Sequence, residues 1–165
     1  MEEKGNLNME VRKHTIKLIV DNKPDVLARI AGVFSGRGFN IESITANVTM
    51  DSGITKINIV TSGNSATVTK IQNQLKKLVD VRQVSHVRET KFGQREMALI
   101  RLKLTEKNKN KLEKAIEDLK CRIITKKSDY YVIETTGTEE EIDRILKHFE
   151  PLGIEDMSRS GIVAL

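Results

Sequence analysis

The order of hydrophobic periodicities repeats once along the chain, and this repetition constrains the fold more than any single motif does. From residue 14 to residue 88, segments with apolar residues at alternate positions are interleaved with segments in which apolar residues recur three or four positions apart. The first pattern is typical of a half-buried strand and the second of an amphipathic helix. Their order is strand, helix, strand, strand, helix, strand, and residues 95–160 repeat it. A chain of 165 residues is long enough for two small domains of this kind.

The first pass contains the stretch from Leu18 to Thr45, which we expect to form a strand, a helix and a second strand. Pro24 fits the first helical position because its missing N–H would be unbonded there in any case. Gly36 and Gly38 follow the apolar helical pattern, where a left-handed residue is favoured. Over the whole first pass we expect strands at residues 14–21, 39–50, 54–61 and 81–88, and helices from residue 24 to the glycines and at residues 65–78.

The second pass follows a short polar connector at residues 89–94. Its last helix is expected to begin at Thr138, which is followed three positions later by Glu141 in the pattern of a capping box. Over this pass we expect strands at residues 95–104, 122–127, 130–136 and 154–160, and helices at residues 106–120 and 138–149.

These elements predict an α+β chain of two tandem ferredoxin-like βαββαβ units, each with two helices on one face of an antiparallel sheet. The expected domains are a flexible N-terminal arm at residues 1–12, a first unit at residues 13–89 and a second unit at residues 95–165. The other sheet face and the strand edges must be covered, because they otherwise favour aggregation. Apolar residues expected on both sides of several strands therefore predict an oligomer. These residues are Ile19, Val60, Ala98, Ile100 and Leu102.

The composition favours a packed core, since 38% of the residues are hydrophobic. No segment approaches the roughly 18 consecutive apolar residues of a membrane span, and residues 1–13 lack the apolar segment of a signal peptide. We therefore expect a soluble, cytoplasmic protein without a membrane span. Cys121 is the single cysteine, so no internal disulfide can form. Because His14, His86 and His148 lie far apart, we expect them on the surface or at strand ends and expect no metal site.

The motifs do not indicate catalysis. Gly36 follows a helix instead of opening one, so the nearby glycines do not match a phosphate-binding loop. The glutamates at positions 139–141 lie in the first turn of a helix, where they stabilise its dipole. RNA-recognition units share the βαββαβ order and the net charge is +5, but the expected central strands contain no aromatic residue on which bases could stack. We expect neither enzymatic activity nor nucleic-acid binding.

The chain contains four segments that together indicate a family, namely VDNKPDVLARIAGVFSGRGFNIESI, QLKKLVDV, REMALIRL and the terminal RSGIVAL. Their order resembles the regulatory small subunit of acetohydroxyacid synthase, also called acetolactate synthase. The resemblance covers nearly the whole chain after the first dozen residues. It implies that residues 13–89 form an ACT domain for effector binding and dimerisation, and that residues 95–165 form a C-terminal regulatory domain.

The resemblance also implies a function without catalysis in this chain. In the family, the small subunit binds and activates a large catalytic subunit that uses thiamine diphosphate, magnesium and FAD. That partner condenses pyruvate with a second 2-ketoacid in branched-chain amino acid biosynthesis. Valine, or a related end product, binds the small subunit and inhibits the enzyme. We therefore expect no cofactor in this chain, a homodimer, a large-subunit partner and an amino-acid effector.

The effector is expected at the loop between the first strand and the first helix. Amides at the open N-terminus of the helix can bind a carboxylate, and Asn22 can add a side-chain amide. Asn22 could instead be a helix N-cap and Asn40 a turn residue, and these roles are compatible with binding. The family's site lies between two ACT domains of a dimer. Matching positions imply that Asn22, Asp25, Val26 and Leu27 of one chain meet Asn40 and Ile41 of the other.

Asp25 departs from the family, which usually has glycine at this position. Glycine lets a ligand approach the backbone closely, whereas Asp25 adds a side chain and a negative charge that would repel a carboxylate. Alternatively, Asp25 stabilises the helix N-terminus and points away from the ligand. From the first reading we expect a subunit that responds poorly to valine or that binds another effector.

A different class of protein would also fit two such units. A stand-alone tandem ACT protein could sense amino acids and control another enzyme or transcription. The short segment before residue 13 has no room for a DNA-binding helix-turn-helix, which favours the regulatory subunit.

Overall fold

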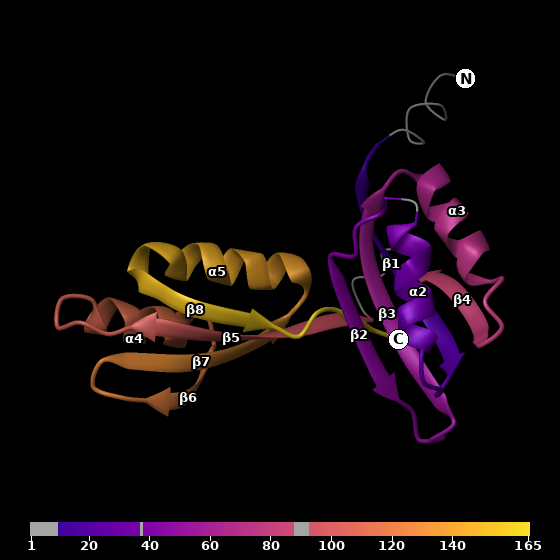
Figure 1. Ribbon diagram of the computed structural model, residues 1–165. Coiled ribbons are helices and arrows are strands. Elements are labelled where there is room, and N and C mark those ends of the chain that lie inside the picture. Colours follow the sequence, from indigo (N-terminus) through magenta and orange to yellow (C-terminus); the bar gives the residue numbers. More distant parts are fainter. Residues whose placement is uncertain (1–9, 37, 88–92) are drawn as a thin grey trace. The chain divides into compact units, whose positions relative to one another are not determined.

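The computed structural model of the chain describes residues 10–36, 38–87 and 93–165. The chain divides into two compact units, of which Gly93–Val163 form the second. Each unit is a sheet with two helices, which confirms the predicted fold class, and the elements can be followed in Figure 1. Residues 1–9 of the predicted arm and residues 88–92, around the predicted connector, lie outside the described residues.

The first unit is a four-stranded antiparallel sheet in the order β2-β3-β1-β4. In the register between β1 and β3, Ile16 faces Ile59 and Leu18 faces Ile57. The elements of this unit are β1 (Arg12–Asp21), α2 (Val26–Ser35), β2 (Ser43–Val48), β3 (Ile54–Gly63), α3 (Ser65–Leu75) and β4 (Val81–Val87).

The core of the first unit lies between the sheet and its helices. Alternate residues of β1 enter it, and Ile16 and Leu18 are fully buried. Helix α2 contributes Val26, Ile30 and Phe34, whose spacing places them on one face of the helix. Burying a side chain such as Phe34 contributes about 1.5–3 kcal/mol to the folding free energy. This packing fixes the direction of α2 and therefore the position of the loop that precedes it.

Strand β2 forms one edge of this sheet. Ile44 and Val48 pair with Ile59 and Thr55 of β3, and both partners are buried. Ile44 is nevertheless 43% exposed and Val48 is 55% exposed. The alternation in β2 therefore produces an apolar edge that the helices of the same unit do not cover.

The second unit repeats the first with the strand order β6-β7-β5-β8, and β9 also pairs with β5. Its elements are β5 (Gln94–Lys103), α4 (Lys109–Asp118), β6 (Arg122–Lys126), β7 (Tyr130–Gly137), α5 (Glu139–Gly153) and β8 (Ile154–Arg159), and they are followed by β9 (Val163–Ala164) at the end of the chain.

The core of the second unit corrects one expectation about the sheet faces. Ala98, Ile100 and Leu102 all have 0% exposure and pack in a single cluster with residues of α4 and α5. Because they occupy alternate positions of β5, they share one face of the strand. They are core residues and do not mark an uncovered surface, so they give no support to the predicted oligomer.

Several element boundaries differ from those expected. Helix α2 begins at Val26 instead of Pro24, because Asp25 has a φ of 66° and is the N-cap. Helix α3 ends at Leu75, after which the amide of Leu78 bonds the Leu75 carbonyl in a tighter turn. Helix α5 continues past Pro151, whose missing N–H costs one bond in the last turn.

One histidine is less exposed than expected. His14 lies near the start of β1 but is only 8% exposed. Its Nε2 lies 3.0 Å from the carbonyl oxygen of Gly63, and its Nδ1 lies 3.0 Å from Nε2 of His86 on β4. The carbonyl requires a proton on Nε2 of His14.

Within the described ranges, no helix is long and apolar enough to cross a membrane.

Candidate functional site

The loop between β1 and α2 is anchored at its first residue. The backbone amide of Asn22 donates to the Gly53 carbonyl at 2.8 Å, and its side-chain amide donates to the Ser52 carbonyl at 2.8 Å. Both acceptors lie in the turn that joins β2 to β3. Asn22 therefore ties the loop to a neighbouring turn, and the N-cap position that it could have taken belongs to Asp25.

The N-terminus of α2 is open. The amides of Val26, Leu27 and Ala28 have no acceptor inside the helix, because they belong to its first turn. The Asp25 side chain accepts no capping hydrogen bond, and the first turn contains no acidic residue. The positive end of the helix dipole and its unbonded donors are thus available for an anionic group such as a carboxylate.

Asp25 has a backbone conformation that favours glycine. Its φ of 66° and ψ of −6° lie in the left-handed region, where a Cβ atom is unfavourable and where Asp and Asn are tolerated better than most residues. The expectation that glycine suits this position therefore has a conformational reason as well as a steric one.

An ion network surrounds the loop. The buried carboxylate of Asp80 accepts from Lys23 Nζ at 3.1 Å and from Arg29 Nη2 at 2.9 Å. Asp21 in turn bonds Lys23 Nζ at 3.1 Å and Arg82 Nε at 2.5 Å. Hydrogen bonds from Lys23 and then from Arg82 hold the pKa of Asp21 below its ordinary value. The bonds from Lys23 to Asp21 and Asp80 raise the pKa of the Lys23 ammonium.

This network could not be predicted from sequence patterns. Lys23 and Asp80 are separated by 57 positions, and neither belongs to a motif that predicts contact between them. Charged residues that follow a strand are expected to be solvated, so their pairing becomes visible only in the structure.

The six predicted site residues do not meet within one chain. Asn22, Asp25 and Leu27 lie at the start of α2, and the Val26 side chain is buried in the core, which leaves its amide as the available group. The other two, Asn40 and Ile41, follow the C-terminal end of α2. Because ten helical residues span about 15 Å, both ends cannot contact one amino acid. Asn40 is exposed, and its backbone carbonyl accepts from Thr61 Oγ1 at 2.7 Å.

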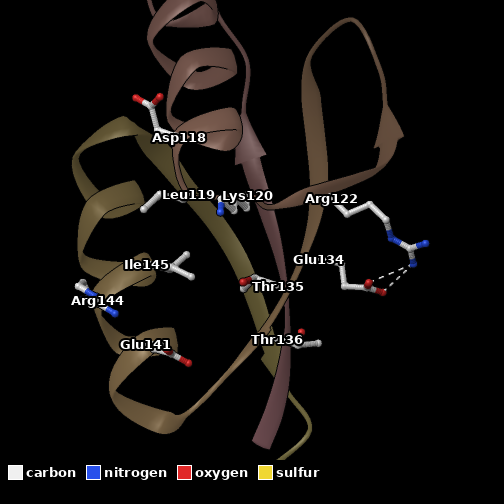
Figure 2. Close-up of a pocket in the computed structure, with 10 residues that line it drawn as sticks. All are labelled: Asp118, Leu119, Lys120, Arg122, Glu134, Thr135, Thr136, Glu141, Arg144 and Ile145. Atoms are coloured by element: carbon white, nitrogen blue, oxygen red, sulfur yellow. Dashed lines mark hydrogen bonds and ion pairs between the residues drawn. The ribbon is translucent and has the colours of Figure 1, made fainter.

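A cavity of about 500 Å³ lies in the second unit, between the end of α4, the sheet and α5, as Figure 2 shows. Arg122 and Glu134 form an ion pair on one side of it, with a distance of 3.0 Å from Nη2 to Oε1. Acidic and basic side chains occur together around it, so the lining does not select a ligand of one charge. The lining residues are Asp118, Leu119, Lys120, Arg122, Glu134, Thr135, Thr136, Glu141, Arg144 and Ile145.

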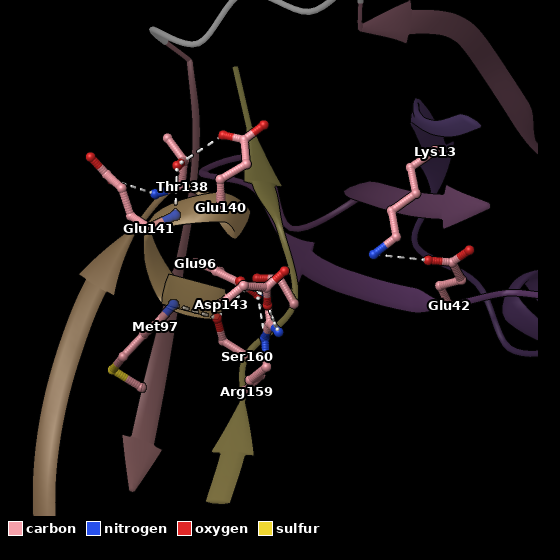
Figure 3. A network of polar contacts seen from close by, with 11 residues as sticks. Lys13, Glu42, Glu96, Met97, Thr138, Glu140, Glu141, Asp143, Arg159 and Ser160 are labelled. Carbon is pink, nitrogen blue, oxygen red and sulfur yellow. Dashed lines mark hydrogen bonds and ion pairs between the residues drawn. The ribbon is translucent and has the colours of Figure 1, made fainter. Parts of the chain in front are cut away.

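Two polar clusters in the second unit serve stability. The side chain of Glu96 on β5 is only 3% exposed and is bonded by Arg159 of β8, which also contacts Asp143 of α5 at 2.6 Å (Figure 3). Thr138 and Glu141 form the predicted capping box, with Thr138 Oγ1 accepting from the Glu141 amide at 3.3 Å. The first cluster joins β5 and β8 to α5, and the second caps the N-terminus of α5.

Two family models match the chain, one over each unit. Residues 16–83 match the ACT domain of acetolactate synthase small subunit-like proteins, and residues 95–165 match the model described as the small subunit of acetolactate synthase. The fold and the loop at the start of α2 thus define a protein of two ferredoxin-like units, the first of which is an ACT domain.

Relatives match nearly the whole chain. The probable acetolactate synthase small subunit of Archaeoglobus fulgidus is 35% identical over 153 residues, which cover 93% of this chain and 96% of the relative. The small subunit of Mycolicibacterium smegmatis is 32% identical and covers 92% of this chain and 89% of its own. The crystal structure of the small subunit from Thermotoga maritima has a TM-score of 0.84, 31% identity and coverage of 93% and 96%. The chain belongs to the family of acetolactate synthase small subunits.

Proposed function

We propose that this chain is a non-catalytic regulatory subunit that binds and activates the large catalytic subunit of acetolactate synthase, and that a branched-chain amino acid, valine, inhibits the enzyme through it. The open N-terminus of α2, in a chain of this family, is the observation that carries this function. The amides of Val26, Leu27 and Ala28 supply donors for the carboxylate of an amino acid. Leu27 is 47% exposed and supplies apolar surface for an aliphatic side chain.

The catalytic groups belong to the partner in this proposal. The large subunit uses thiamine diphosphate, magnesium and FAD, while this chain binds none of them and contributes regulation in the cytoplasm. Residues 10–36, 38–87 and 93–165 contain no group of three or more His, Cys, Asp or Glu side chains placed to hold a metal ion.

The effector site is shared by two copies of the chain. Asn22, Asp25 and Leu27 of one copy meet Asn40 and Ile41 of the other, because the two sets lie at opposite ends of α2 in a single chain. The exposed apolar edge at Ile44 and Val48 supports a homodimer, since an uncovered edge strand favours pairing with another chain. The test is sedimentation equilibrium, in which Ile44→Lys and Val48→Lys are expected to weaken self-association.

The wild-type chain responds weakly to valine in this proposal. Asp25 places a negative charge beside the amides that bind the carboxylate, and its side chain is exposed and accepts no capping bond. The charge opposes the approach of an anionic group to the helix N-terminus, and the exposure of the side chain to solvent reduces this repulsion.

The functional test is reconstitution with the large subunit from the same organism, supplied with thiamine diphosphate, Mg²⁺ and FAD. Acetolactate formation is measured with and without this chain and then during a valine titration. We expect the chain to raise the rate several-fold and valine to lower it. The range of subunit ratios must include ratios at which formation of the complex has been measured. If the rate of acetolactate formation is unchanged over that range, the activating role is contradicted.

Two surface variants separate the effector site from general effects. Leu27→Lys is expected to abolish the response to valine while activation is retained. Met157 on β8 is the matched control, because it is 48% exposed and Leu27 is 47% exposed. If Met157→Lys removes the valine response as completely as Leu27→Lys does, the assignment of the effector to α2 is wrong.

A further inference from the structure

We propose that Asp80 is a positioning residue for the loop at residues 22–28. In this role its carboxylate holds both ends of the loop and so sets the direction of the amides at the start of α2. Naming these amides as the effector-binding groups rests on the proposed function, whereas the contacts of Asp80 do not.

The two oxygens of Asp80 have different partners. Oδ1 accepts from Lys23, which precedes the N-cap, and Oδ2 accepts from Arg29, which lies one turn after it. The two bonds therefore bracket Asp25 and the first turn of α2. The side chain of Asp80 is 8% exposed, whereas those of Lys23 and Arg29 are 56% and 50% exposed. The buried carboxylate is thus the fixed point that two half-exposed cations contact.

The backbone holds Asp80 in place independently of its side chain. Its carbonyl accepts from the amide of Asp21 at 2.9 Å, and the following amide, that of Val81, donates to the Leu78 carbonyl at 3.1 Å. Val81 then pairs with Val20 at the start of β4. Asp80 is therefore fixed by the sheet on one side and by the turn after α3 on the other, which makes it a rigid anchor.

The negative charge of Asp80 is needed to hold the two ends of the loop. A buried carboxylate is costly unless it is paired, so Lys23 and Arg29 are held against it and cannot follow a ligand. Their donor groups are directed at Asp80, whereas the amides of α2 are the donors directed toward an incoming carboxylate. Between the two anchored cations, the chain passes through the left-handed conformation at Asp25. The anchors on each side over-determine that unfavourable conformation.

Hydrogen exchange tests the positioning role in the full chain without any effector. The amides of Asn22 and Arg29 bond the carbonyls of Gly53 and Asp25, so their exchange reports on the two ends of the loop. In Asp80→Asn, which keeps the shape and removes the charge, we expect both amides to exchange at least tenfold faster. The amides of core strand β3 should keep their rates.

Three further variants control this experiment. Asp80→Glu retains the charge and is expected to restore part of the protection, which a role in packing alone would not predict. Arg29→Gln removes one anchor at an exposed side chain and keeps the test open if Asp80→Asn fails to fold. Glu113→Gln removes a more exposed carboxylate that also has two partners, Lys126 and Tyr131 in the second unit, and should leave the loop unchanged. Loop exchange in Asp80→Asn and Arg29→Gln that equals the wild-type rate overturns the positioning role.

Calorimetric titration with L-valine tests the connection to function. It is performed in the Asp25→Gly background, where binding is expected to be tighter, and adding Asp80→Asn should weaken it at least tenfold. Unchanged valine affinity in that double variant also overturns the positioning role. If loop exchange increases as expected but no variant binds valine, the effector assignment fails while the positioning role stands.

Discussion

Replacing Asp25 separates two effects that this residue has on the loop. The first is conformational, because Asp25 adopts a φ of 66°. Most residues with a Cβ atom lose about 1–2 kcal/mol in this region and Asp loses less, whereas glycine loses about 0.4–1 kcal/mol through the greater freedom of its unfolded chain. We therefore expect Asp25→Gly to stabilise the first unit by at most about 1 kcal/mol, a rise of no more than a few degrees in its melting temperature.

The second effect is electrostatic. A carboxylate bound at the amides of α2 would lie about 5 Å from the Asp25 carboxylate, and the repulsion is about 3 kcal/mol at an effective dielectric constant near 20 and about 1 kcal/mol in bulk water. Because Asp25 is exposed, the true value lies between these limits. Removing the charge is therefore expected to tighten valine binding by about fivefold to a hundredfold.

Asp25→Asn distinguishes these effects, since Asn keeps the side-chain shape and tolerates the left-handed region but has no charge. Calorimetric titration with valine, together with thermal unfolding, is performed on wild type, Asp25→Asn and Asp25→Gly. The electrostatic reasoning predicts tighter binding in both variants and greater stability only in Asp25→Gly. If Asp25→Asn binds valine as weakly as wild type while Asp25→Gly binds tightly, the charge is not the cause. Equal, tight binding in all three refutes any inhibitory role for Asp25.

Further predictions concern stability. Arg159→Met leaves the buried carboxylate of Glu96 unpaired and should destabilise the second unit by about 3–5 kcal/mol in urea titrations, a loss that an added Glu96→Gln should largely reverse. Thr138→Ala removes the capping box of α5 and should cost about 1 kcal/mol, whereas Thr138→Ser should cost little. Asp21 has a lowered pKa in the folded chain, so its stabilising contribution is present above the unfolded pKa and is lost as the pH falls through the folded value. Unfolding of Asp21→Asn should accordingly depend less on pH below about 4 than that of wild type; an unchanged dependence would contradict the role of the Lys23 and Arg82 contacts.

The element order could be predicted because it follows from local periodicity. Val68, Ile71 and Leu75 recur at helical spacing and form the buried stripe of α3, and Thr138 begins α5 as its capping pattern indicates. The boundaries were less accurate, because they depend on individual backbone angles. Pro24 is a favourable first helical residue, yet the left-handed conformation of Asp25 moves the start of α2 to Val26.

The candidate site was predictable only in its local part. The open helix N-terminus follows from a strand, a short loop and a helix in sequence. The attachment of Lys23 and Arg29 to Asp80 does not, because it depends on how the turn after α3 meets the start of α2. The exposure of Ile44 could not be predicted either, because the alternation in β2 does not indicate that the helices leave this edge uncovered.

The two units show why a repeated fold need not repeat a site. In the first unit the loop before α2 is held from outside by Asp80, and no side chain caps the helix. In the second unit the loop before α4 is filled by its own residue, since the Asn108 side chain donates to the carbonyls of Lys103 and Leu152 and accepts from the Thr105 amide at 2.8 Å. The loop before α4 is therefore held by a residue of its own, whereas the loop before α2 is held by Asp80, and the N-cap side chain of neither helix makes a capping bond. The same order of strands and helices thus supports two different ways of holding the loop that precedes the first helix of a unit.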